Sequence, residues 1–381
     1  MDIRFWVTYY AKCLWNLIYA YFPRVRPATK PAGQKFQLHP YFYRVDLSGS
    51  YLDMGVQYGR LLRPILARDV RIWLAFIRKN RAIFKKRIPE KYARDCIFES
   101  IQTLYRDNLA HYNPDVLAYM RGVAEGAGLP FTDLLHANLF SDLMDNHCVL
   151  LSKMIDGSPM HLRTLDYGTP QVAQCLTVFH PTGRHAYASL NQCYLVGVFT
   201  GLSVRGVFFG ESYYDAPLDP GPVAFLGTPF HHLAHRLLAD ADSAAAAVEM
   251  LRGCQRQSNL QILLADDASA GVYLASQTVC RRVDPPAGQD NQDNQDNQDN
   301  QENHGTVYSV TPNEQAKFNQ NMNLLDTLDN VLSKFIPQTK SGELHVAVKH
   351  AGRLYVSVTT DVLQAYNNRF HVFELAELFQ T

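Results

Sequence analysis

Residues 145–168 read DNHCVLLSKMIDGSPMHLRTLDYG, and this stretch decides the fold prediction. Two runs with β-strand character flank an Asp-Gly pair at 156–157, which is the strongest short signal for a β-hairpin turn. With that turn, Arg163 lies diagonally across from Cys148 on the same face, within reach of its long side chain. Asp166 follows at the end of the second strand. The hairpin therefore brings a thiol, a guanidinium and a carboxylate to one corner.

Two interpretations fit this corner. A guanidinium stabilises a nearby thiolate, and a carboxylate can orient an amine or the guanidinium, so the three groups suit a nucleophile site. The plainer alternative is a buried structural cysteine near a surface ion pair. Composition alone favours the alternative, because free cysteine is among the most buried residue types.

An ordered series of motifs surrounds the hairpin, and their shared order matters more than any one of them. Over about residues 45–335 the chain resembles the cysteine-type N-terminal-nucleophile (Ntn) hydrolases. The acyl-coenzyme A:penicillin acyltransferase group is most similar, and choloylglycine hydrolase, penicillin V acylase and acid ceramidase are more distant. The stretches that carry the resemblance are VDLSGSYLDMGVQYGRLL (45–62), GVAEGAGL (122–129), RTLDYG (163–168), TPFHHLAHRLLADADSAAAAVEMLR (228–252), SNLQILLADDASAGVYLAS (258–276) and VTPNEQ (310–315).

This resemblance implies an α+β fold, namely a four-layer αββα sandwich preceded by an N-terminal helical extension. Residues 39–381 are then the Ntn-type domain, in which 39–147 form the first part and 148–381 the second. Residues 1–38 are a helix and linker.

The resemblance also implies that the precursor cuts itself between His147 and Cys148. Cys148 then serves as nucleophile, and its new α-amine, with an ordinary pKa of about 8, as base. Arg163 and Asp166 position the amine and the thiol, and Asn313 supplies an oxyanion donor together with a backbone N–H.

Asn259 and Asn191 are secondary candidates for substrate or oxyanion contacts, and a structural asparagine in a turn is the alternative for each. Val149, Thr164 and Glu314 depart from the family pattern, which usually has Thr or Ser, Asn and His at these positions. These departures keep open a second class of function, a non-catalytic membrane-associated scaffold that retains the Ntn fold.

The first segment, FWVTYYAKCLWNLIYAYF (5–22), has the pattern of an amphipathic helix with a wide apolar face. Lys12 and the missing small-x-small site argue against a signal peptide. Either the helix lies on a membrane, with Arg24, Arg26 and Lys30 against anionic headgroups, or it packs on its own domain. The protein is accordingly expected at a membrane surface or in the cytoplasm.

Composition excludes several classes. Thirty-six basic residues balance thirty-six acidic ones, which argues against nucleic acid as a partner. Seven cysteines without a C-x-x-C pair argue against a disulfide mini-fold or a zinc ribbon. His231 and His235 have the i, i+4 spacing of a metal pair, but no Glu or Cys signal accompanies them, so no metal or other cofactor is expected.

The expected partners are a small-molecule amide or acyl-coenzyme A substrate with an apolar acyl group, and the protein's own two cleaved chains. The repeat at 289–303, four copies of Gln-Asp-Asn followed by Gln-Glu-Asn, has no apolar side chain and is predicted to be a disordered loop.

Secondary structure is expected to change character at Cys148. A helical pattern extends over 43–119, and strand-like runs dominate 148–209, among them YLVGVF (194–199). One helix is predicted over 229–252, and two strands at the C-terminus.

Overall fold

The computed structural model describes residues 33–86, 88–139, 148–166, 172–214, 225–283, 306–309, 318–360 and 363–380. The amphipathic segment 5–22, the repeat 289–303, His147 and Asn313 lie outside these residues, so the predictions made for them remain predictions.

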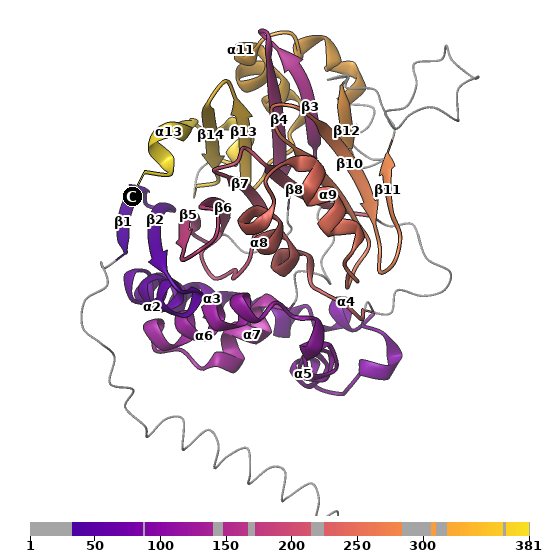
Figure 1. The fold of residues 1–381 in the computed structure, drawn as a ribbon. Coiled ribbons are helices and arrows are strands. Elements are labelled where there is room, and N and C mark those ends of the chain that lie inside the picture. The colour runs from indigo at the N-terminus through magenta and orange to yellow at the C-terminus, as the bar shows by residue number, and fades with distance from the viewer. Residues whose placement is uncertain are drawn as a thin grey trace, which may run out of the picture. The chain divides into compact units, whose positions relative to one another are not determined.

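Two β-sheets form the centre of the described part (Figure 1). The nine-stranded sheet has the order β1-β2-β5-β6-β7-β8-β9-β10-β11, and the six-stranded sheet the order β12-β3-β4-β13-β14-β15. Pairing is antiparallel except between β2 and β5, which run parallel from Phe42↔Gln174 to Gly49↔Pro181. The strands are β1 (Gln34–His39), β2 (Phe42–Gly49), β3 (Leu150–Ile155), β4 (Ser158–Leu165), β5 (Gln174–Pro181), β6 (Tyr187–Gln192), β7 (Thr200–Ser203), β8 (Phe208–Tyr213), β9 (Leu260–Ala265), β10 (Ala270–Ala275), β11 (Cys280–Val283), β12 (Val307–Ser309), β13 (His345–His350), β14 (Arg353–Val358) and β15 (His371–Glu374).

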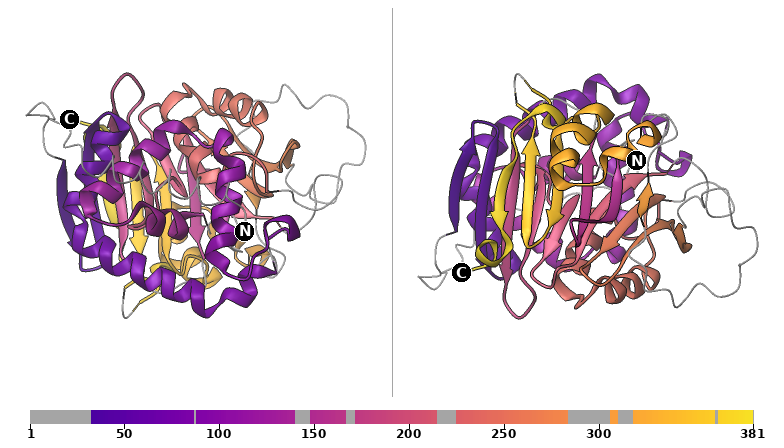
Figure 2. Two further views of the ribbon diagram at one scale, coloured as in Figure 1. Left: turned by 90° about the horizontal axis from the view of Figure 1, so that it is seen from below. Right: turned by 90° about the horizontal axis from the view of Figure 1, so that it is seen from above.

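Helices cover both outer faces of this pair of sheets, as the two views of Figure 2 show. The helices before β3 are α2 (Tyr51–Leu61), α3 (Arg63–Lys79), α4 (Arg81–Lys85), α5 (Ile97–Asn108), α6 (Pro114–Ala127) and α7 (Phe131–Asn138). Those that follow are α8 (Phe230–Asp240), α9 (Ala244–Arg252), α11 (Leu328–Asn330), the π-helical turn η6 (Val331–Phe335), α12 (Ile336–Thr339) and α13 (Leu375–Leu378). Short 3₁₀ turns are η1 (Glu90–Tyr92), η2 (Leu109–His111), η5 (Met322–Leu324) and η7 (Ala365–Asn367).

The buried apolar side chains form separate clusters, on the outer face of each sheet and between the two sheets. The largest cluster joins α2, α3 and α5 to α9 with the outer face of the nine-stranded sheet. A second joins η6 and α12 to the outer face of the six-stranded sheet. Two further clusters lie between the sheets and contain, for example, Leu176, Leu263 and Val356. The predicted four-layer αββα architecture is confirmed.

Helices α2 and α6 cross with their backbones in contact. Ser50 caps α2. Asn113 caps the start of α6, and Gly128, whose φ of +68° suits glycine, caps its end. Each helix carries two glycines four residues apart, and a Cβ at any of them would collide with a carbonyl oxygen of the other helix. These glycines are Gly55, Gly59, Gly122 and Gly126. Two of the motifs that carry the family resemblance are thus the two halves of one helix crossing.

Five secondary-structure expectations were wrong in part. The helical region 43–119 begins with strand β2, where Tyr43, Val45 and Leu47 alternate with polar residues at the period of a strand. Residues 34–38 belong to β1 and pair with β2, so they are part of the sheet and not of a linker.

The helix predicted over 229–252 is two helices, since α8 ends at Asp240 and the side chain of Ser243 caps α9. The run 194–199 is a buried turn and not a strand, because the side chains of Asn138 and Asn191 bind its main-chain N–H groups. A third strand, β15, follows the two predicted at the C-terminus.

Candidate active site

The hairpin β3–β4 forms with the register that the sequence predicts. Leu150 lies opposite Arg163, and the turn residues Asp156 and Gly157 have φ of +50° and +76°. Two successive positive φ values define the type I′ turn that Asp-Gly favours. This turn places Cys148 and Asp166 at the far end of the hairpin.

Cys148 is fully buried. Burial raises the pKa of its thiol above the ordinary value, because desolvation disfavours the thiolate. The positive charge of Arg163 and a hydrogen bond from the backbone of Asp166 lower this pKa, while the carboxylates of Glu211 and Asp166 raise it further, so the net shift is upward. The thiol, the guanidinium and the carboxyl-bearing residue therefore lie together as the sequence suggested.

Arg163 forms a buried ion pair with Glu211 of β8, and both side chains are fully buried. Nη2 of Arg163 lies 2.7 Å from Oε1 of Glu211 and also donates to the Glu211 carbonyl oxygen at 3.1 Å. Gly210 makes room for this side chain, since a Cβ there would lie 2.7 Å from Cγ of Arg163. The pair links the six-stranded sheet to the nine-stranded one.

His345, at the start of β13, completes the surroundings of the guanidinium. Its Nε2 lies 3.1 Å from Nη1 of Arg163 and 2.9 Å from the hydroxyl of Thr200, while its Nδ1 faces Oε1 of Gln174 at 3.3 Å. Because a guanidinium only donates, Nε2 is the acceptor and the ring proton is on Nδ1. Burial and the charge of Arg163 hold the pKa of His345 well below its usual range, so the ring is neutral.

A chain of hydrogen bonds leads from the residue after Cys148 to Asp166. The N–H of Val149 donates to the Thr164 hydroxyl at 2.8 Å, and the hydroxyls of Thr164 and Ser341 are 2.6 Å apart. Ser341 in turn donates to Oδ2 of Asp166. Thr164, one of the departures from the family pattern, thus has a defined role in connecting the nucleophile strand to the carboxylate.

The turn after α12 holds the other oxygen of Asp166. The N–H groups of Gly342 and Glu343 donate to Oδ1 at 2.7 and 2.6 Å. Burial raises the pKa of Asp166, and the bonds from Ser341, Glu343 and Gly342 act against that rise. Every bond is donated to the carboxylate, which fixes its orientation at the end of β4.

The two secondary candidates, Asn191 and Asn259, are both buried. Both polar ends of the Asn191 side chain bind the main chain of the buried turn, at Gly197 and Phe199, which fits the structural alternative for this residue. Asn191 pairs with Cys175 and faces the helix-covered side of its sheet, away from Arg163. Asn259 is buried immediately before β9, and its carbonyl oxygen accepts from the N–H of Tyr214 at 3.3 Å.

Sequence reasoning missed Glu211, His345 and Ser341. Glu211 had a usable signal, because it is the one charged residue in the run GVFFGESYY (206–214) and a buried strand carboxylate needs a cation. His345 and Ser341 follow the hairpin by more than 170 residues, and no local pattern ties them to it.

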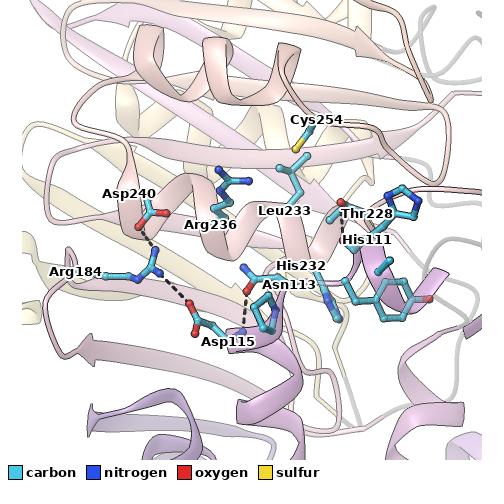
Figure 3. A pocket seen from close by; sticks show the side chains of 13 residues that line it. His111, Asn113, Asp115, Arg184, Thr228, His232, Leu233, Arg236, Asp240 and Cys254 are labelled. Atoms are coloured by element: carbon cyan, nitrogen blue, oxygen red, sulfur yellow. Dashed lines mark hydrogen bonds and ion pairs between the residues drawn. The ribbon is translucent and has the colours of Figure 1, made fainter. Parts of the chain in front are cut away.

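A separate hollow of about 430 Å³ lies between the start of α6 and helix α8 (Figure 3). Arg184 crosses it and forms ion pairs with Asp115 and Asp240, and His232 and Arg236 also line it. None of the predicted catalytic residues lines this hollow.

His235, considered above as half of a metal pair, forms a hydrogen bond through Nδ1 with the hydroxyl of Tyr187. Within the described ranges, three or more His, Cys, Asp or Glu side chains nowhere gather as a metal site would require. None of the helices described is long and apolar enough to cross a membrane.

No family model matches the chain. Among curated proteins, dcd1A of Dictyostelium discoideum is 24% identical over 153 residues, 36% of this chain and 34% of that protein. The match therefore spans about a third of that relative's length.

Three solved structures resemble the chain in fold. The Caenorhabditis elegans ortholog of N-acylethanolamine-hydrolyzing acid amidase has a TM-score of 0.38 at 14% identity, and the match covers 53% of this chain and 92% of that one. A mutant conjugated bile acid hydrolase from Clostridium perfringens has a TM-score of 0.36 at 10% identity, and the match covers 60% of this chain and 93% of that one. Penicillin V acylase from Agrobacterium tumefaciens has a TM-score of 0.35 at 8% identity, and the match covers 56% of this chain and 83% of that one. These structures are of cysteine-type Ntn hydrolases, the group that the sequence motifs resemble.

Proposed function

We propose that the chain is a cysteine amidohydrolase or acyltransferase that becomes active by cutting itself between His147 and Cys148. The observation that carries this proposal is the corner at the end of the β3–β4 hairpin. There Cys148 receives a hydrogen bond from the backbone of Asp166 and lies in the field of the buried Arg163 guanidinium. The guanidinium thus offsets part of the cost of forming a thiolate at this buried position.

Maturation begins when the thiol of Cys148 attacks the carbonyl carbon of His147. The C–N bond breaks, the nitrogen takes the thiol proton, and the acyl group moves to sulfur as a thioester. Water then hydrolyses the thioester, which leaves a carboxylate on His147 and frees the thiol and α-amine of Cys148.

Turnover uses the same sulfur. The α-amine of Cys148 takes the thiol proton, and the thiolate attacks the carbonyl carbon of an N-acyl amide or acyl thioester. Asn313 and a backbone N–H donate to the developing oxyanion. The amine or thiol leaves with the proton, and water or an acceptor amine then releases the acyl group from Cys148.

Arg163 and Asp166 have distinct parts in this scheme. Arg163 favours the thiolate electrostatically, and Glu211 and His345 hold it in one orientation. Asp166, whose two oxygens accept from Ser341 and from the N–H groups of the turn after α12, orients the new α-amine in this scheme. The substrate is proposed to carry an apolar acyl group, and hydrolysis and acyl transfer use the same residues.

The mass of the purified protein tests the proposal. Wild-type protein is expected to give two chains, residues 1–147 and 148–381, and Cys148→Ala a single chain without turnover. Cys96→Ala, at an exposed cysteine, is the control and should be cut normally. A Cys148→Ala protein that is still cut and still active would contradict the proposal, and a wild-type chain that stays whole would favour the scaffold alternative.

Asn313→Ala tests the proposed oxyanion donor in turnover. Loss of one oxyanion donor typically lowers kcat by about 10² to 10³. The variant should therefore lose that much activity on an N-acyl amide, and Asn191→Ala should instead lower the free energy of unfolding. Equal kcat for Asn313→Ala and wild type would remove Asn313 from the mechanism.

A further inference from the structure

The segment 78–94, which contains α4 and the turns beside it, is strongly basic in a chain of zero net charge. Its one acid is Glu90. Its described cations are Arg78, Lys79, Arg81, Lys85, Lys86, Lys91 and Arg94. We call this segment the basic surface. A balanced total charge therefore conceals a local excess of positive charge.

The basic surface is part of the folded body. Phe84, Ile88 and Tyr92 are buried in the core beneath it, so the chain is fixed at three points. All of its described cations are exposed except Lys85, which is half-buried. Apolar residues thus anchor the segment to the core while the described cations face solvent, which fixes the charges to the folded body.

These charges are not neutralised by the described part of the protein. No carboxylate there forms an ion pair with any of the seven. Arg81 and Arg94 donate to main-chain carbonyl oxygens, and Arg78 and Lys91 lie over the rings of Phe98 and Tyr92. Such contacts orient the cations and leave their charge available to an anionic partner.

An apolar side chain lies among these cations. Ile83 in the middle of α4 is 56% exposed, more than any other large hydrophobic residue in the described ranges. An exposed isoleucine flanked along the chain by cations is the combination that interfacial membrane segments use, with the apolar group entering the acyl boundary and the cations meeting headgroups. Nucleic-acid surfaces instead add aromatic or polar groups for the bases.

We propose that the basic surface docks the protein on an anionic membrane, with Ile83 inserted at the headgroup level. The basic surface continues from a helix that is fixed to the rest of the helical layer. Helix α3, which leads into the basic surface, packs on α7, and Nε1 of Trp73 donates to the carbonyl oxygen of Ala137 at 2.9 Å. The chain after α7 leads to Cys148. The proposal does not depend on catalysis, and it holds for an uncut chain as well.

Co-flotation of the full-length protein with vesicles tests it. The probes are vesicles of phosphatidylcholine alone and of phosphatidylcholine with phosphatidylserine, and the readout is the partition coefficient from a lipid titration. The test variant is the triple Arg81→Gln, Lys85→Gln, Lys86→Gln. The matched control removes three exposed cations that lie elsewhere, by Arg121→Gln, Arg281→Gln and Arg369→Gln.

Wild type should bind the phosphatidylserine vesicles and the triple variant about a hundredfold less, since each cation near an anionic surface contributes roughly fivefold. Ile83→Ser should weaken binding about tenfold, because its apolar contact is lost. The control triple should bind as wild type does, and salt near 1 M, where the Debye length is about 3 Å, should remove the difference between the triples.

Equal loss in both triples would overturn the proposal, because net charge and not this surface would then be responsible. Undiminished binding of the Arg81/Lys85/Lys86 variant would overturn it too and leave the N-terminal segment as the attachment. A protein that binds a DNA duplex through these cations but no vesicle would assign the surface to nucleic acid instead.

Discussion

The guanidinium of Arg163 and the carboxylate of Glu211 are 2.7 Å apart and both fully buried, and they join the two sheets next to Cys148. Neither charge has access to water, so each depends on the other. Removing one partner of a buried pair costs about 3–5 kcal/mol, because the remaining charge is left uncompensated.

Glu211→Gln should therefore lower the free energy of unfolding by about that amount, measured by urea denaturation. The double variant Arg163→Met, Glu211→Leu should recover much of the stability and remain inactive, because the charge beside the thiol is gone. Arg353→Gln is the control, since its pair with Glu374 is about half exposed and its loss should leave the free energy of unfolding nearly unchanged. A Glu211→Gln protein as stable as wild type would show that Arg163 and Glu211 do not form a solvent-excluded ion pair.

Ser341→Ala should change the pH dependence of activity under the proposed mechanism. The Ser341 hydroxyl lowers the pKa of Asp166, so its removal raises that pKa further. If the carboxylate must be ionised, the acid limb of the kcat/KM profile moves to higher pH. The control Ser333→Ala removes an exposed hydroxyl that binds only a main-chain oxygen. An unshifted acid limb would exclude Ser341 as a positioning residue for Asp166.

Thr164→Val should interrupt the same hydrogen-bond chain at its other end. The N–H of Val149 then loses its acceptor, and the Ser341 hydroxyl loses a neighbour. An unsatisfied buried group costs about 1–3 kcal/mol, which should appear as lowered stability in urea denaturation and slower self-cleavage. Cleavage at the wild-type rate would argue that the chain of hydrogen bonds is only structural.

The hairpin corner could be predicted from the sequence because the signals that define it are local. The Asp-Gly turn and two strand runs are adjacent, and they fix which residues share a face with Cys148. Glu211 and Ser341 come from β8 and from the turn before β13, and reach the corner only once two sheets are stacked. A strand's own periodicity says which face a residue occupies, and it contains nothing about which other sheet lies opposite.

Acid should destabilise the protein through its buried histidines. Burial lowers the pKa of His161, His232 and His235 to about 3, against 6.5 in the unfolded chain. Between these values only the unfolded state binds the proton. Each histidine therefore removes about 1.4 kcal/mol of stability per pH unit as pH falls below 6.5.

His232→Phe isolates one of these contributions. Among the described residues neither ring nitrogen of His232 has a hydrogen-bond partner, and its ring packs on Tyr112, so phenylalanine keeps the contact without the titration. The slope of unfolding free energy against pH between about 6 and 4 should be shallower by about 1.4 kcal/mol per unit. If the slopes of unfolding free energy against pH are the same in wild type and His232→Phe, His232 is not a buried neutral histidine in the folded protein.

Gly59→Ala should destabilise the protein, although alanine is normally better than glycine inside a helix by about 1 kcal/mol. The added methyl group would meet the carbonyl oxygen of Val123 and force α2 and α6 apart. Overpacking of this kind costs about 1–3 kcal/mol or more. Gly253→Ala is the matched control, because its Cβ would have only ordinary contacts and its φ is −75°. Melting temperatures of the two variants should move in opposite directions or differ by several degrees.

The parallel ladder between β2 and β5 has a consequence for the mature protein. Eight residue pairs join these strands, and β2 precedes the His147–Cys148 bond while β5 follows it. After scission the nine-stranded sheet would consist of two polypeptides, and its native hydrogen bonds would be unchanged. Refolding, however, would become a second-order reaction, and the midpoint of unfolding would fall on dilution. Maturation would thus convert a protein whose stability is independent of its concentration into an obligate heterodimer. Such a protein would fold efficiently only before cleavage, while it is still a single chain.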